Sequence, residues 1–261
     1  MSGLCNHALD LTGVAGDPAS PVHRLDPRAK IVGLVGVTLV SVSTPIADWP
    51  VYAACAAVLA AVAIAARVPP LTIWRRTRVV LPLFLLAAAF VPFLRTGGAT
   101  HQVGPFTVSD AGLAVLGAVS AKAAIGTLSA VLLGATTSFP AVLRGLDALR
   151  VPRLFTLIAA FMYRYLFVIV EEVHRMRTAL AARAYRPRHV LQARPIGGAV
   201  NALFLRTYAR GERVHLAMLS RGYTGTMPEL LPLSFGRADA AFAGAIVVSL
   251  VALRLAIGGL A

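Results

Sequence analysis

Residues 154–170 read LFTLIAAFMYRYLFVIV, and the position of this stretch decides how often the chain crosses a membrane. The stretch is almost entirely apolar, but a helix needs about 20 apolar residues to span a bilayer. A crossing would place Arg164 near mid-membrane, at roughly 2.5–3.5 kcal/mol on insertion scales. It would also put Arg153 and Arg175 on opposite sides of the membrane. We therefore interpret the stretch as an interfacial or protein-packed helix that does not cross.

Charged residues follow one line along this helix. At 100° per residue, Arg164 and Arg175 fall on nearly the same line, and Glu171 lies beside them, four residues before Arg175. The pattern predicts a narrow polar stripe of Arg164, Glu171 and Arg175 on a mostly apolar helix. We expect Glu171 and Glu172 to lie opposite Arg164 and Arg175.

The composition of the whole chain is that of a membrane protein. It has 261 residues, of which 57% are hydrophobic and 14% charged, and its mean hydropathy is +0.75. Soluble domains carry about 25% charged residues. The net charge is +14, and 15 of the 25 Lys and Arg residues lie in the segment 137–238. Because these cations flank apolar segments, membrane topology explains them better than nucleic-acid binding, and we expect no nucleic-acid partner.

The hydropathy pattern predicts an all-α integral membrane protein with about five transmembrane helices. Lys and Arg gather before the first span and after the second, whereas the loops 44–49 and 95–110 hold only Arg95 between them. This distribution predicts a cytoplasmic N-terminus and an external C-terminus. We divide the chain into a cytoplasmic tail (1–28), a transmembrane region (29–136), a block of coupling helices (137–238) and a final span (239–261). The five predicted spans are 29–42, 50–66, 79–94, 111–136 and 239–257.

Three helices are predicted in the basic block before the last span. Ser138 is placed to cap a short helix over 139–149, a long helix runs from about 152 to 183, and a third starts at Pro195 and ends at Gly222. Apolar positions repeat every three, four or seven residues on the third helix, which predicts one packed face. This face consists of Val200, Leu203, Thr207, Val214 and Met218.

The two long helices end in matching tripeptides, each with one arginine between small residues. An exposed Arg offers five planar donors to carboxylates or carbonyls of a partner, and small neighbours allow close approach. The simpler interpretation is C-terminal capping, in which Arg complements the helix dipole for less than about 1 kcal/mol. The repetition favours docking. The tripeptides are Ala182-Arg183-Ala184, followed by Tyr185, and Ser220-Arg221-Gly222, followed by Tyr223.

These features resemble the T component of energy-coupling factor (ECF) transporters over nearly the whole chain beyond Val22. The resemblance rests on the paired tripeptides, the central helices and the opening segment 23–30, HRLDPRAK. Segments 82–95 (PLFLLAAAFVPFLR) and 161–176 (FMYRYLFVIVEEVHRM) are most similar to the cobalt-associated CbiQ subgroup.

The resemblance implies a multi-pass scaffold in the inner (cytoplasmic) membrane that couples ATPase motion to cobalt(II) uptake. Arg183 and Arg221 would dock into grooves on two ABC-type ATPase subunits. The membrane part would hold a substrate-binding S component, with a small accessory membrane subunit possible in cobalt systems. ATP and Mg would be bound by the ATPase subunits, and this chain would bind no cofactor or metal. The family tripeptide is Ala-Arg-Gly, from which Ser220 departs mildly and Ala184 departs at the glycine. Since Ala disfavours positive φ, we expect the backbone or the fit of the first site to differ, so that the two docks are unequal in strength.

Enzymatic function is not supported by the sequence. There is no G-x-x-x-x-G-K-[ST] segment and no Cys/His cluster at zinc spacing. A membrane enzyme would need a polar catalytic set within the spans, and only Lys122 lies there. We interpret Lys122 as bound to a structural partner within the complex, with an ion pathway as the weaker alternative. Two functional alternatives stay open: a T component for nickel or a vitamin such as biotin, and a self-sufficient carrier.

Small residues recur every four positions in two predicted spans. Such faces allow close helix packing in lipid, either within the chain or against the S component. The faces are Ala53, Ala57, Ala61 and Ala65 in the second span, and Gly126, Ala130 and Gly134 in the fourth.

Overall fold

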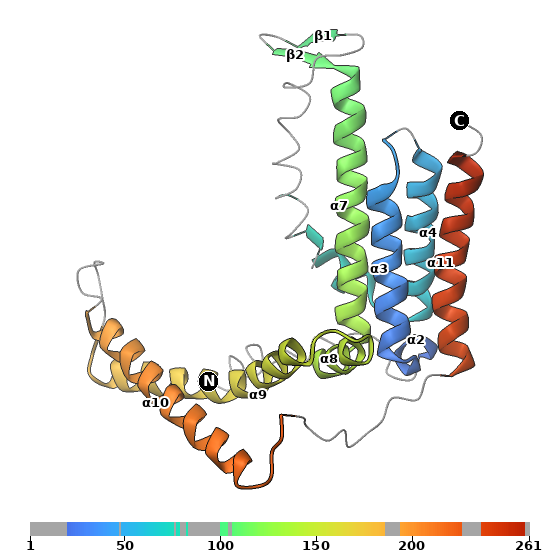
Figure 1. Cartoon of the computed structure of the whole chain (residues 1–261). Coiled ribbons are helices and arrows are strands. Elements are labelled where there is room, and N and C mark those ends of the chain that lie inside the picture. Colours follow the sequence, from blue (N-terminus) through green and yellow to red (C-terminus); the bar gives the residue numbers. More distant parts are fainter. Residues whose placement is uncertain are drawn as a thin grey trace. The chain divides into compact units, whose positions relative to one another are not determined.

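The chain forms two compact units, one of residues 1–152 with 233–261 and the other of residues 153–232. The computed structural model (Figure 1) describes residues 20–46, 48–75, 77–78, 82, 100–103, 106–185, 194–225 and 236–258. The first unit is a helical bundle and the second is a pair of long helices. The predicted all-α architecture is therefore confirmed, whereas the predicted span 79–94 lies outside the described residues apart from Pro82.

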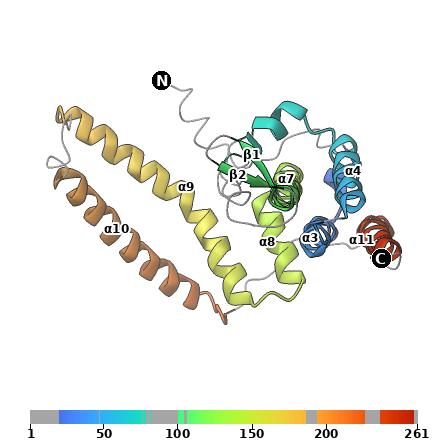
Figure 2. The same ribbon diagram turned by 90° about the horizontal axis from the view of Figure 1, so that it is seen from above.

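Helix α3 is the central element of the first unit, because it packs against α4, α7, α8 and α11. Figure 2 shows α3, α4, α7 and α11 nearly end-on, with α3 between α7 and α11. These four helices match four of the predicted spans to within two residues. The described helices of this unit include α2 (Pro21–Arg24), α3 (Pro27–Ser43), α4 (Trp49–Ala65), α7 (Asp110–Thr136), α8 (Phe139–Ala148) and α11 (Arg237–Gly258).

Hydrogen bonds among three segments of the chain fix the beginning of α3. Asp26 is its N-cap, accepting a hydrogen bond from the Arg28 backbone N–H at 2.9 Å, and Pro27 starts the helix. The buried backbone N–H of Asp26 donates to the Asp239 carboxylate of α11 at 2.7 Å. The Lys30 ammonium, also buried, donates to the Thr136 carbonyl at the end of α7. The opening segment 23–30 thus joins α3 to both α7 and α11.

Lys122 of α7 fixes the other end of α3. Its ammonium donates to the carbonyls of Val42 and Thr44, each at 2.9 Å. The Tyr52 hydroxyl donates to the Thr44 carbonyl as well, at 3.1 Å, and the Tyr52 ring lies 6.0 Å from the ammonium. A cation at the carbonyl end of a helix complements the helix dipole. The charge of Lys122 therefore has a partner within this chain, as its structural interpretation predicts.

Glycines allow two close helix contacts to α3. A Cβ added at Gly145 of α8 would come within 2.9 Å of Ile31 and 3.1 Å of Pro27, so α8 packs directly on the start of α3. A Cβ added at Gly36 would come within 3.2 Å of the Val247 side chain of α11. Ser138 stands at the N-cap of α8, but its side chain makes no capping hydrogen bond, so the predicted cap was wrong in that respect.

A short antiparallel hairpin lies in the loop before α7 and was not predicted. Strand β1 (Thr100–Val103) pairs with β2 (Phe106–Ser109), with Thr100 opposite Ser109 and Val103 opposite Phe106. The sequence analysis treated this segment only as a loop.

The second unit consists of α9 (Arg153–Ala182) and α10 (Arg194–Leu219), which pack against each other. The predicted bounds of both helices differ from the observed ones by at most three residues. By length and composition alone, residues 112–136 of α7 and the whole of α9 are apolar enough to cross a membrane, among the residues searched. Only 6% of the α9 window is buried, so this helix presents its apolar surface outward.

The first prediction concerns Lys122. Replacing it with Met leaves the carbonyls of Val42 and Thr44 without a cationic donor, which costs about 1–3 kcal/mol. We expect the thermal unfolding midpoint of the purified chain in detergent to fall for Lys122→Met and to be largely retained for Lys122→Arg. An unchanged midpoint for Lys122→Met would contradict the structural role of this side chain.

Candidate functional site

The end of α9 carries the first predicted docking tripeptide in a defined backbone motif. Ala184 has a left-handed backbone with φ of +54°. Its N–H donates to the Ala181 carbonyl at 3.0 Å, and the Tyr185 N–H donates to the Leu180 carbonyl at 3.1 Å. This pair of hydrogen bonds is the Schellman motif, which ends a helix with one left-handed residue. Arg183 is the residue just before it, at the C-cap.

The end of α10 repeats this geometry residue for residue. Gly222 is left-handed with φ of +80°. Its N–H donates to the Leu219 carbonyl at 3.0 Å, and the Tyr223 N–H donates to the Met218 carbonyl at 3.0 Å. Arg221 stands at the C-cap, as Arg183 does on α9. The backbone of the first site does not differ in kind, because Ala184 adopts the conformation that Gly222 adopts without strain; a difference in the fit or strength of docking stays a prediction.

Both arginines are exposed, as are the other four residues of the two tripeptides. Within the described ranges, neither guanidinium makes a hydrogen bond or an ion pair. The carbonyls at these helix ends are bonded by backbone N–H groups instead. The Arg side chains are therefore not used for hydrogen-bonded capping, and their planar donors face solvent.

The two tripeptides lie at opposite tips of the second unit. Figure 2 shows α10 beside α9 with the opposite direction, and Figure 1 shows α10 crossing α9 at an angle, so the C-terminal ends of the two helices point away from each other. At 1.5 Å rise per residue, helices of 30 and 26 residues are roughly 40–45 Å long. A single small pocket cannot hold two groups separated by such a length. The arrangement suits two separate binding partners.

Left-handed helix ends are not confined to the tripeptides. Arg67 after α4 and Arg150 after α8 have φ of +51° and +65°, with the same pair of backbone hydrogen bonds. In those two ends the arginine itself is the left-handed residue. The tripeptides differ because their arginine stands one position earlier, between small residues. Arginine at the C-cap, rather than the left-handed turn, is what Arg183 and Arg221 share.

The predicted polar stripe is only partly assembled. Arg175 binds both carboxylates, with its guanidinium 3.1 Å from Glu171 and 2.9 Å from Glu172. Arg164 is exposed and makes no hydrogen bond or ion pair with any described residue, so the expected pairing of the two glutamates with Arg164 was wrong. Glu172 instead pairs with Arg206 of α10. The sequence analysis missed Arg206, since nothing local links positions 34 residues apart.

The pKa of the Glu172 carboxyl is lowered by hydrogen bonds from Arg206 and Arg175. A carboxyl with a lowered pKa contributes stability that is present at neutral pH and is lost as pH falls through that pKa. The carboxylate stays ionised near neutral pH and joins α9 to α10.

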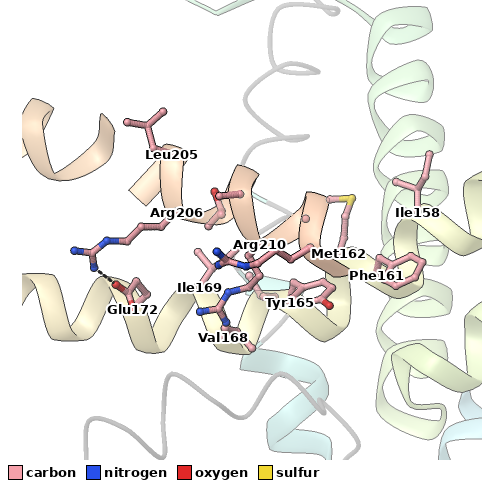
Figure 3. Close-up of a pocket in the computed structure, with 15 residues that line it drawn as sticks. Ile158, Phe161, Met162, Tyr165, Val168, Ile169, Glu172, Leu205, Arg206 and Arg210 are labelled. Atoms are coloured by element: carbon pink, nitrogen blue, oxygen red, sulfur yellow. Dashed lines mark hydrogen bonds and ion pairs between the residues drawn. The ribbon is translucent and has the colours of Figure 1, made fainter. Parts of the chain in front are cut away.

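A groove of about 940 Å³ lies between α9 and α10 (Figure 3). Its α9 wall is mostly apolar, and its α10 wall carries three arginines. Figure 3 shows Arg206 reaching Glu172, with Arg210 close to Tyr165 and Ile169. The sequence analysis did not predict this groove.

The predicted small-residue face of α4 is exposed. Ala53, Ala57, Ala61 and Ala65 are all open to the surroundings, whereas the opposite face buries larger residues. Packing against the part of the chain that the structure describes therefore does not explain these four alanines. In α7 the face is mixed: Ala130 is exposed, Gly126 and Gly134 are half-buried, and Gly126 faces Thr38 of α3.

Comparison with known proteins places this architecture in a class: the chain is a transmembrane component of an ECF-type transporter. It belongs to the CbiQ family, described as cobalt transport protein, whose model matches residues 18–230. In this class the membrane component is generally non-catalytic, and ATPase activity lies with partner subunits.

Three relatives illustrate the similarity. The chain is 30% identical over 217 residues to the cobalt transport protein CbiQ of Rhodobacter capsulatus, covering 78% of this chain and 84% of that one. It is 27% identical over 218 residues to the ECF transporter transmembrane protein EcfT of Heliobacterium modesticaldum, covering 79% and 81%. It is 25% identical over 227 residues to a putative fused cobalt transport protein CbiMQ of Methanocorpusculum labreanum, covering 85% of this chain but only 37% of that longer protein.

The second prediction concerns the strain at Ala184. A left-handed backbone costs an L-residue roughly 1–2 kcal/mol relative to Gly. Ala184→Gly should therefore slow hydrogen exchange of the Tyr185 N–H by roughly five- to thirtyfold, since 1.4 kcal/mol is a factor of ten. The matched control, Ala181→Gly, puts glycine at a helical position and should speed exchange instead. Equal effects of the two substitutions would contradict the left-handed conformation.

Proposed function

We propose that this chain is the coupling subunit of an ATP-driven importer of cobalt(II). The observation that carries the proposal is the repeated helix end, with Arg183 and Arg221 exposed in the same backbone motif at opposite tips of one hairpin. Each tip is suited to one ABC-type ATPase subunit. The family description and the name of the Rhodobacter relative support cobalt as the substrate.

The docking chemistry follows from the geometry of the tripeptides. A guanidinium presents its donors in one plane and binds carboxylates in a bidentate manner. At both tips the flanking residues are small: Ala182 and Ala184 on α9, Ser220 and Gly222 on α10. A partner groove is therefore able to approach the backbone and surround the arginine. Movement of the two ATPase subunits relative to each other then moves the two ends of the hairpin.

The hairpin lies outside the hydrocarbon core in this proposal, although α9 is apolar enough to span it. The reason is that α9 is packed along α10, which brings Arg206, Arg210 and Arg213 beside it. Inserting α9 would draw these cations and the unpaired Arg164 into lipid, at roughly 2.5–3.5 kcal/mol per arginine near the helix centre. An interfacial position keeps the apolar surface of the hairpin covered and its cations hydrated.

The remaining parts of the proposal concern topology and partners. The Lys and Arg bias supports a cytoplasmic N-terminus, five spans including 79–94, and an external C-terminus in the cytoplasmic membrane. The exposed alanine face of α4 is suited to pack against an S component, which would hold the substrate, with an accessory membrane subunit alongside. ATP and Mg belong to the ATPase subunits, and no cofactor is assigned to this chain.

The third prediction tests the docking residues. Replacing Arg183 and Arg221 together with Ala removes both sets of donors from exposed positions, so the fold should be retained. We expect the ATPase subunits to be lost on affinity purification in mild detergent, and cobalt uptake to fall at least tenfold. The matched control, Arg144→Ala with Arg164→Ala, removes two exposed arginines from the middle of α8 and the middle of α9, away from both tripeptides. Full ATPase retention and full uptake by the first variant would refute docking.

The fourth prediction tests the position of α9. Single cysteines at Arg144 and Leu180, placed in a variant without Cys5 and Cys55, should both react with a membrane-impermeant thiol reagent only from the cytoplasmic side. Labelling from opposite sides would show that α9 crosses the membrane.

Two transport assays separate the competing functions. The purified chain alone in liposomes should carry no cobalt, which excludes a self-sufficient carrier. Uptake assays on the whole complex with cobalt, nickel and biotin distinguish the three substrates.

A further inference from the structure

The groove between α9 and α10 combines two opposite chemistries in one space. Its α9 wall is mostly apolar and includes Ile158, Phe161 and Met162. Its α10 wall contributes Arg206, Arg210 and Arg213, which follow one another at spacings of four and three residues and so share a helix face. Figure 3 shows Arg206 and Arg210 on the α10 side and the apolar residues along α9.

The cations of the groove exceed its anions. Glu172 is the one carboxylate among the lining residues, and Arg206 and Arg175 already bind it. Arg210 and Arg213 are exposed and make no ion pair with any residue that the structure describes. Two guanidinium groups therefore remain available to an anion that enters the groove.

Helices α9 and α10 expose many large apolar side chains, some of which, such as Met162 and Leu205, line the groove. Met162 is 68% exposed and Phe204 is 64% exposed, and several other large apolar side chains of the two helices share this condition. Contiguous exposed apolar surface marks an interaction site for protein or membrane. The other exposed large apolar side chains of α9 and α10 include Leu154, Phe155, Ile158, Leu166, Val200, Leu205, Tyr208 and Leu216.

We propose that this groove binds an anionic phospholipid, with the phosphate held by Arg210 and Arg213 and an acyl chain lying along the α9 wall. A volume of about 940 Å³ lies within the range of roughly 300–1,000 Å³ typical of pockets for small molecules. An anionic lipid matches both walls, since it is the ligand that joins a negative headgroup to a long apolar chain. A protein segment would match the groove only if its acidic residues faced the arginines of α10 while its apolar residues faced the α9 wall.

The inference rests on the proposed position of α9 outside the bilayer core, which the cysteine labelling tests separately. It does not depend on docking by Arg183 or Arg221. A lipid bound here would anchor the hairpin to the membrane surface through a headgroup of the cytoplasmic leaflet. Basic segments next to membranes are generally attracted to anionic headgroups.

The test uses the full chain in nanodiscs made from equal parts of phosphatidylglycerol and phosphatidylcholine. Native mass spectrometry after release of the protein should show retained phosphatidylglycerol in preference to phosphatidylcholine. The variant Arg210→Gln with Arg213→Gln should reduce this preference on the order of tenfold, because each cation contributes to headgroup binding. The control, Arg177→Gln with Arg194→Gln, makes the same change of charge outside the groove and should keep the preference.

Two further arms separate the sources of the signal. Soluble glycerol phosphate should not displace the retained lipid, since it lacks the acyl chain; displacement would overturn the lipid assignment in favour of a plain anion site. A photoreactive residue at Met162 should crosslink to lipid in membranes, and crosslinking to a partner protein instead would also overturn it. Equal loss of lipid from the groove variant and its control would show that net charge, not the groove, holds the lipid.

Discussion

The bundle depends on polar contacts at the two ends of α3. In lipid, apolar surfaces gain little from meeting each other, so apolar packing alone does not fix one arrangement of helices. At the start of α3, Asp239 binds the Asp26 N–H, and Lys30 reaches the end of α7. At the other end, Lys122 binds the final carbonyls of the helix. These contacts join α3, α7 and α11, which are distant in sequence, and fix the position of each helix along the axis of its neighbours.

Much of the helical architecture could be predicted from the sequence, because helix ends are specified locally. Prolines, caps and the glycine at position 222 gave bounds for α9 and α10 within three residues. What could not be predicted depends on pairs far apart in the chain. Glu172 meets Arg206, and Asp26 meets Asp239, only once the helices have packed. A single sequence contains no signal for such pairs. Of the two arginines expected opposite the glutamates, Arg175 was confirmed and Arg164 was not.

The candidate site shows the same division. The tripeptides were found from the sequence because they repeat, and their exposure is what two docking groups require. Their common backbone was not predicted, since Ala184 stands where glycine is preferred. The left-handed conformation at Ala184 arises because the alternative leaves the last carbonyls of α9 without the N–H groups of Ala184 and Tyr185. Satisfying those carbonyls outweighs a local steric cost of roughly 1–2 kcal/mol.

The identity of the two helix ends has a consequence for the stoichiometry of the assembly. A single polypeptide has no internal symmetry axis here, yet it offers the same Arg-bearing turn twice. Partners that recognise this turn therefore need only one shape of receptor surface, and one gene product used in duplicate is sufficient. Under the proposed docking, an asymmetric membrane subunit could therefore engage a twofold-symmetric pair of ATPase subunits.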